Sequence, residues 1–203
     1  MTNDKYRAYP AYSNSDLSAF MDWRYGNKRY GLTAKAFEVG SAVHQLVLEP
    51  HLETKVSALE AERVAGMVRA LKRHPTVAWA LQWGRKEQAI FRVCPSTGLP
   101  LKAKLDIRYK SSIVYDLKTT SAVSEKAFLS HFDEYGYDRQ AAFYLDSVGA
   151  KRFVFVPVQK STFQVYTVEA SQELIARGRK KYQRILEEIK KVGWKPDRWN
   201  EAV

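Results

Sequence analysis

The stretch LKAKLDIRYKSSIVYDLK, residues 101–118, decides the fold of this 203-residue chain. Apolar and polar residues alternate in both of its halves, and this period of two predicts two β-strands. The alternating apolar positions, Leu101 to Ile107 and Ile113 to Leu117, are all odd-numbered. Pairing the strands as a hairpin with one shared apolar face therefore requires an odd-length loop or a bulge around residues 110–112.

This register brings two carboxylates and a lysine onto one face. Asp106 lies opposite or diagonal to Asp116, and Lys118 follows two residues further along. Opposed like charges destabilise a strand pair and aspartate is disfavoured inside strands, so a purely structural role does not favour the arrangement. A divalent metal between the carboxylates would reverse the sign of that cost. The alternative is a solvated strand face on which two acids happen to align.

The composition describes a basic chain with room for one core. At 45% hydrophobic residues, the length favours a single domain, 1–203, over two. A total of 33 Lys and Arg against 22 Asp and Glu gives a net charge of +11, which indicates a polyanionic partner, nucleic acid ahead of an acidic membrane surface. The apolar runs are too short for a membrane span and residues 1–10 lack a signal-peptide pattern, so the cytosol is the default compartment. The single cysteine, Cys94, excludes an internal disulfide and a thiolate-ligated iron–sulfur cluster.

Helices and further strands surround the hairpin in the sequence. Apolar periodicity and capping residues predict helices at about 14–22, 34–48, 53–73, 124–132, 137–148 and 171–192. Further strands are predicted at 87–94, 152–158 and 162–168. No repeat, low-complexity tract or linker interrupts this series, which again favours one domain.

Several other residues are candidates for chemistry, each with a structural alternative. His44 lies beside an apolar helical stripe, where a histidine is most often structural. Gln140 and Tyr144 share a helix face, and a polar pair at the edge of the core explains them equally well. For Glu87 the structural interpretation is favoured over a metal ligand. The sequence has no phosphate-binding glycine loop, zinc-ligand set or nucleophile elbow.

Four segments together resemble the PD-(D/E)XK nuclease superfamily, and within it the RecE-like phage and prophage exonuclease branch, which is related to lambda exonuclease and RecB nuclease domains. They are GSAVHQLVLEP (40–50), GLPLKAKLDIRY (98–109), IVYDLKTT (113–120) and YDRQAAFY (137–144). The N-terminal YPAYSNSDLSAF (9–20) is similar to the serine-rich opening helix of such domains. D-x-K alone is a weak pattern, but the order H…D…DxK…QxxxY is specific. Branches that need a cysteine-ligated cluster are disfavoured by the cysteine count.

The resemblance implies an α/β (α+β) fold, a restriction-endonuclease-like core with a central mixed sheet of about five strands flanked by helices. It also implies roles for individual residues. His44, Asp106, Asp116 and the backbone carbonyl of Leu117 would hold the metal, and Lys118 would help to generate hydroxide and stabilise charge on the phosphate. Gln140 and Tyr144 would steady the site. The candidates for DNA contact are Lys102, Lys104, Arg108, Thr119 and Arg139, with a solvated strand face as the alternative for the first three.

The function implied by the resemblance is a Mg²⁺- or Mn²⁺-dependent exonuclease, with two ions, that degrades one strand from double-stranded DNA ends, 5′ to 3′. The single-stranded tail would pass to a RecT-like annealing recombinase, and the nuclease would form a homo-oligomeric ring in the cytosol of a bacterium carrying a phage or prophage. One alternative is a structure-specific endonuclease on the same fold. Another is a non-catalytic DNA-end-binding protein. An RNA-binding domain is disfavoured because the sequence lacks an RNP-type strand or GXXG loop.

Overall fold

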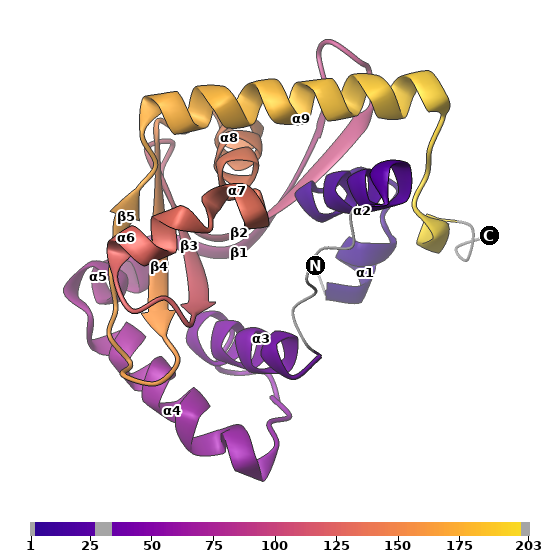
Figure 1. Ribbon diagram of the computed structural model, residues 1–203. Helices are drawn as coiled ribbons and strands as arrows, with labels where there is room; N and C mark the ends of the chain where they lie inside the picture. Colours follow the sequence, from indigo (N-terminus) through magenta and orange to yellow (C-terminus); the bar gives the residue numbers. More distant parts are fainter. Residues whose placement is uncertain (1–2, 27–33, 200–203) are drawn as a thin grey trace.

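A five-stranded sheet lies at the centre of the computed structural model, which describes residues 3–26 and 34–199 (Figure 1). Its spatial order follows the chain: β1 (Arg85–Val93), β2 (Pro100–Tyr109), β3 (Ile113–Thr120), β4 (Arg152–Gln159) and β5 (Val168–Glu169). β3 and β4 are parallel, and the other neighbours are antiparallel. The expected mixed sheet of five strands flanked by helices is therefore confirmed.

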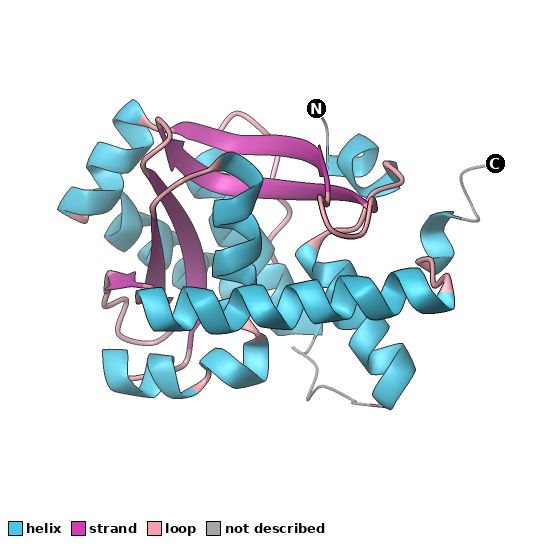
Figure 2. Cartoon of the chain, turned by 90° about the horizontal axis from the view of Figure 1, so that it is seen from above, coloured by secondary structure: helices cyan, strands magenta, loops and turns pink. Residues whose placement is uncertain are grey.

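Helices cover both faces of this sheet and bury a separate apolar core on each (Figures 1 and 2). One core involves α2 (Asn14–Tyr25), α8 (Tyr137–Val148) and α9 (Gln172–Val192). The other involves α3 (Ala34–Leu48), α4 (Ala58–Arg73) and α5 (Pro75–Trp83). The shorter helices are α1 (Asn3–Ala8), α6 (Glu125–Ser130), α7 (Phe132–Tyr135) and the 3-10 turn η1 (Asp197–Trp199).

The hairpin between β2 and β3 has the loop that the parity of its apolar residues requires. Three residues, Lys110 to Ser112, connect the strands, and Lys110 takes a left-handed φ of 52°. Ile107 pairs with Tyr115, so the next position towards the site is that of Asp106 and Asp116. The ladder ends there, and the Leu117 N–H donates to the Asp106 carboxylate instead.

The expectation of one apolar face on this hairpin is wrong. Leu101, Ala103 and Leu105 belong to the core under α8 and α9, whereas Ile107 belongs to the core under α3, α4 and α5. Helices cover both faces, so β2 can exchange one core for the other along its length. The exchange falls at Asp106, and the β1 ladder is interrupted at the same level, where Glu87 has a φ of 51°.

Several element boundaries also differ from the sequence-based prediction. The expected strand at 162–168 is reduced to β5 and one bridge between Val158 and Val165, because Phe163 has a φ of 59° within the tight connection after β4. The helix expected at 53–73 begins at Ala58, and the one expected at 124–132 divides into α6 and α7 at His131. Helices α1 and α5 were not expected.

The long helix α9 packs closely on α8 because residue 178 is glycine. A Cβ added at Gly178 would lie 1.9 Å from the Asp138 carbonyl oxygen, so no larger side chain fits at this crossing. The Gly178 contact thereby fixes α9 against α8, and Gln140 of α8 in turn donates to Asp116 of β3.

Candidate active site

A cavity of about 810 Å³ opens where α3, β2, β3 and α7 meet. Helix α3 buries Val39, Val43 and Val47 in the core, so His44 lies at the edge of that stripe and faces the sheet. Seven of the residues that the sequence singled out line this cavity. They are His44, Glu87, Lys104, Asp106, Leu117, Lys118 and Thr119.

The Asp106 carboxylate, on β2, contacts both helix α3 and strand β3. Its Oδ2 accepts a 2.7 Å hydrogen bond from the Leu117 N–H and lies 3.4 Å from His44 Nδ1. Burial lowers the pKa of His44, but the Asp106 carboxylate outweighs burial and the net direction is upward. Burial conversely raises the pKa of Asp106, yet His44, Lys118 and the Leu117 N–H together lower it. The histidine therefore stabilises the charged form of this carboxylate.

Asp116 is buried between β3 and α8. Gln140 Nε2 donates to its Oδ1 at 2.9 Å. Its Oδ2 is in close ion-pair contact with Lys118 Nζ, and Lys118 is its one ion-pair partner among the described residues. Burial and the charge of Asp106 raise the pKa of Asp116 to about 6, against the opposing effect of Lys118. Asp116 is thus harder to ionise than an ordinary aspartate, and further positive charge beside it would favour its ionised form.

These two carboxylates fit a hard divalent cation. Oxygen ligands suit Mg²⁺ and Mn²⁺, and Mg²⁺ is commonly bound through one or two carboxylates with water in its remaining positions. Across residues 3–26 and 34–199, no three His, Cys, Asp or Glu side chains form a compact ligand group. An ion here would therefore depend on Asp106 and Asp116, with water and backbone oxygens completing its shell. The expectation that His44 and the Leu117 carbonyl are ligands stays a prediction.

Gln140 and Tyr144 lie behind Asp116 rather than in the cavity. Both come from α8, and a hydrogen bond to Gln140 is among the influences on Tyr144, although burial dominates and raises its pKa well above the ordinary value. The Tyr144 ring packs against Phe143 and Phe153. The pair therefore connects Asp116 to the core, which agrees with the expected steadying role.

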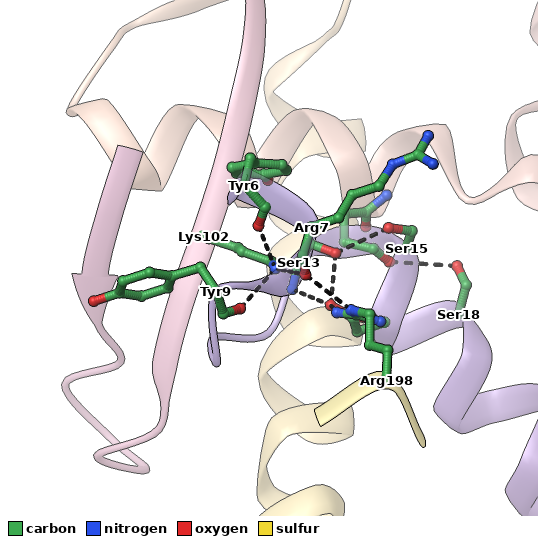
Figure 3. A network of polar contacts seen from close by, with 10 residues as sticks. Tyr6, Arg7, Tyr9, Ser13, Ser15, Ser18, Lys102 and Arg198 are labelled. Carbon is green, nitrogen blue, oxygen red and sulfur yellow. Dashed lines mark hydrogen bonds and ion pairs between the residues drawn. The ribbon is translucent and has the colours of Figure 1, made fainter. Parts of the chain in front are cut away.

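Lys102 is not a DNA contact, contrary to the sequence-based prediction (Figure 3). Its side chain is buried, and Nζ donates to the backbone carbonyls of Tyr6, Arg7 and Tyr9 at 2.8–2.9 Å. Burial and the Arg198 guanidinium lower its pKa to about 8. All three ammonium hydrogens are used internally, so Lys102 fastens the N-terminal segment across β2 instead of facing solvent.

Arg139 is also internal, and its prediction as a phosphate contact is wrong for this structure. The guanidinium donates to Asn14 Oδ1 at 2.9 Å and to Ser18 Oγ, so it connects α8 with α2. Arg108 donates to the Lys110 carbonyl at the end of the hairpin, and it is not among the described residues that line the cavity.

Lys104 and Thr119 do line the cavity. Lys104 forms ion pairs with Glu87, at close range, and with Glu49 at 3.7 Å. This pairing supports the structural interpretation of Glu87, although its side chain is in the cavity wall. Sequence reasoning missed Glu49 as part of this wall, and it missed Arg7, Phe37, Tyr135 and Lys160. These residues come from distant segments, so their spacing carries no signal.

Two aspartates on adjacent strands, with a lysine two residues after the second, are presented by a helix-covered mixed sheet. This combination defines the PD-(D/E)XK class of nuclease fold. The chain belongs to the family described as the PDDEXK-like domain of unknown function DUF3799, whose model matches residues 18–201. The resemblance inferred from the four motifs is thereby confirmed at the level of the superfamily.

Three solved structures are similar to this chain to different degrees, and the first of them shares its fold. A putative exonuclease from Eubacterium rectale superposes with a TM-score of 0.65 at 19% identity, covering 97% of this chain and 89% of that one. A phage-related exonuclease from Haemophilus somnus 129PT gives 0.47 at 12% identity, covering 93% and 97%. An alkaline exonuclease from Laribacter hongkongensis gives 0.43 at 14% identity, covering 93% and 92%. No curated protein matches this chain.

Among the described residues, no helix combines the length and apolar character of a membrane span.

Proposed function

We propose that this protein is a Mg²⁺- or Mn²⁺-dependent deoxyribonuclease that degrades DNA from double-stranded ends. The observation that carries the proposal is a pair of acids on adjacent strands: the buried Asp116, paired with Lys118, and Asp106, whose charge helps to raise the pKa of Asp116 to about 6. Each buried acid has a basic neighbour, Lys118 for Asp116 and His44 for Asp106, and a divalent cation shared by the two carboxylates would stabilise them further. The net charge of +11 suits a polyanionic substrate.

Each residue then has a defined task. A divalent ion held by Asp106 and Asp116 would activate water and neutralise charge on the scissile phosphate. Lys118 Nζ, held against Asp116, keeps a positive charge beside the same position and stabilises the charge that develops there. His44 keeps Asp106 ionised and oriented, and Gln140 orients Asp116 through Oδ1.

The proposal extends to polarity and partners. Degradation would run 5′ to 3′ on one strand, and the remaining tail would serve a RecT-like annealing recombinase. A homo-oligomeric ring would keep the enzyme on its substrate, and two metal ions would act together at the phosphate. The solved structures described as exonucleases support the choice of an exonuclease within the PD-(D/E)XK class, since one of them shares this fold at a TM-score of 0.65.

The decisive experiment uses a linear duplex labelled separately at each 5′ end, incubated with Mg²⁺ or with EDTA and followed over time. Labelled mononucleotides released only with Mg²⁺ support a 5′ to 3′ exonuclease, whereas progressive shortening that retains the 5′ label reverses the polarity. Asp116→Ala should abolish degradation while DNA binding survives. Degradation by that variant at the parent rate would show that the assigned site is wrong.

A closed circular duplex tests the alternative of a structure-specific endonuclease on the same fold. An exonuclease leaves the circle intact until it is cut by another enzyme, because no strand end is present. Nicking or linearisation of the circle by the purified protein, lost in Asp116→Ala, would favour the endonuclease. Binding of ends without any cleavage in Mg²⁺ or Mn²⁺ would favour the non-catalytic end-binding protein.

A further inference from the structure

Three aromatic rings form a continuous row along one wall of the active-site cavity. His131, Tyr135 and Tyr137 all line the cavity. The centroids of His131 and Tyr135 are 5.7 Å apart, and those of Tyr135 and Tyr137 are 5.6 Å apart. Beyond Tyr137, Lys118 Nζ lies 5.2 Å from the ring centroid. The row, called here the ring ladder, therefore leads to the catalytic lysine.

Tyr137 is the fixed end of the ladder, and the central ring, Tyr135, is partly exposed. Tyr137 packs against Phe128, Phe132 and Phe155 of the core, at centroid distances of 5.4–5.6 Å. Tyr135 is 37% exposed, in contrast to the neighbouring Phe132, which is buried. The exposed part of the Tyr135 side chain lies in the cavity lining, so it is accessible to a ligand that enters the cavity.

The remaining cavity wall supplies a further aromatic ring and cations. Phe37, on α3, lines the same cavity and is 55% exposed. Arg7, whose backbone is held by Lys102, and Lys160, at the end of β4, also line it. Exposed rings in series between cationic side chains are the arrangement by which proteins bind single-stranded nucleic acid, with bases on the rings and phosphates on the cations.

We propose that the ring ladder is a stacking track for unpaired bases of the strand that is being cut. This inference rests on the proposed nuclease function and names the form of DNA that the site accepts. Bases inside a duplex are already stacked on their neighbours and present only their edges, so they cannot lie on the tyrosine faces. The terminal nucleotides must therefore separate from the complementary strand before the phosphodiester reaches Lys118.

Binding of a single strand tests the ladder without catalysis. The probe is a fluorescein-labelled oligothymidylate of about twelve nucleotides, within the site sizes of single-strand binders, and binding is followed by anisotropy in EDTA. Tyr135→Ala should weaken binding about tenfold, whereas Tyr135→Phe, which keeps the ring, should stay within about twofold of the parent. His131→Ala should weaken it in the same direction. Trp83→Ala is the matched control, since Trp83 is 61% exposed on α5 and is absent from the described cavity lining.

A second measurement needs no variant. A 2-aminopurine placed near the end of a single strand should lose fluorescence when it stacks on the ladder of the parent protein. Circular dichroism and thermal melting establish that each variant is folded. Parent-like binding by folded Tyr135→Ala, or unquenched 2-aminopurine in the parent complex, would overturn the proposal.

Failure of the ladder and failure of the nuclease are distinguishable. If Asp116→Ala abolishes degradation but Tyr135→Ala binds single strands normally, only the stacking track is wrong. If the parent never cleaves DNA yet single-strand binding depends on Tyr135, only the nuclease is wrong. In the parent, duplexes with several mismatched terminal pairs should be degraded faster than blunt ones, and Tyr135→Ala should reduce this preference.

Discussion

Gln140 Nε2 on α8 donates a 2.9 Å hydrogen bond to Asp116 Oδ1 on β3. It fixes the carboxylate in the rotamer that leaves Oδ2 towards Lys118 and the neighbouring acid. This hydrogen bond joins a helix to the sheet, so the position of the Asp116 carboxylate depends on how α8 packs against β3. That seating depends in turn on the close α8–α9 crossing at Gly178.

Gln140→Ala should lower activity without abolishing it. Loss of the group that orients a metal-binding carboxylate typically costs about 10- to 100-fold in metal affinity or activity. The measurement is the rate of nucleotide release across a Mn²⁺ titration, compared with Ser147→Ala, a change on the same helix at a side chain that bonds the Phe143 carbonyl. Parent-like rate and metal dependence in Gln140→Ala would contradict the orienting role.

Divalent metal should stabilise the parent protein through Asp106 and Asp116. A ligand that binds only the folded state at about a hundredfold excess over its Kd adds about 2.7 kcal/mol, which corresponds to roughly 5 °C or more in Tm for a chain of this size. Thermal melting with and without Mn²⁺ measures the shift. Asp116→Asn should lose it, and Glu169→Gln, at an exposed ion pair with Arg152, should keep it. An equal shift in Asp116→Asn would place the metal elsewhere.

Lys102→Met should destabilise the fold. The change leaves three carbonyl acceptors, of Tyr6, Arg7 and Tyr9, without their donor, at a cost of at least about 3 kcal/mol. Chemical denaturation measures this cost. Lys104→Met is the comparison from the same strand, and its partly exposed ion pairs predict a smaller loss. A Lys102→Met variant as stable as the parent, but weaker on DNA, would restore the original interpretation of Lys102 as a DNA contact.

The stability of the α8–α9 pair should depend on pH through Asp146. Burial raises the pKa of Asp146, but Arg179 and Tyr182, which donate to its carboxylate at 2.6–2.8 Å, lower it overall. Because the folded-state pKa is depressed, the stabilisation is present above the ordinary value of 3.8 and is lost as pH falls through the folded-state pKa. Asp146→Asn should therefore be less stable than the parent at neutral pH.

Melting temperatures of the parent and Asp146→Asn, measured from neutral pH down into the acid range, test this linkage. The difference between the two proteins should shrink at the acid end, where the parent carboxylate is also protonated. A difference that stays constant with pH would mean that packing, rather than the charge of Asp146, explains the loss.

The motifs alone predicted the superfamily and most of the elements around the site. The odd parity of the apolar residues predicted an odd-length loop or a bulge around 110–112, where the structure has a three-residue loop, and the apolar stripes marked α3 and α8 at their observed bounds. The register also brought Asp106 and Asp116 to the same level. These features are local, since they depend on periods of two and of 3.6 residues, on hairpin geometry and on capping.

Burial and partners, in contrast, were decided by tertiary structure. Lys102 and Lys104 occupy alternate positions of one strand, yet one is enclosed by the N-terminal segment and the other lines the cavity. The period-two alternation of a strand specifies the face of the sheet on which a side chain lies, but it does not specify which segments cover that face. The exchange of cores at Asp106 and the ring ladder arise in the same way, because they depend on how segments distant in sequence pack together. The sequence by itself determined the class of fold and the shared level of the two candidate acids, Asp106 and Asp116, while long-range packing decided which cations and rings remain available to a substrate.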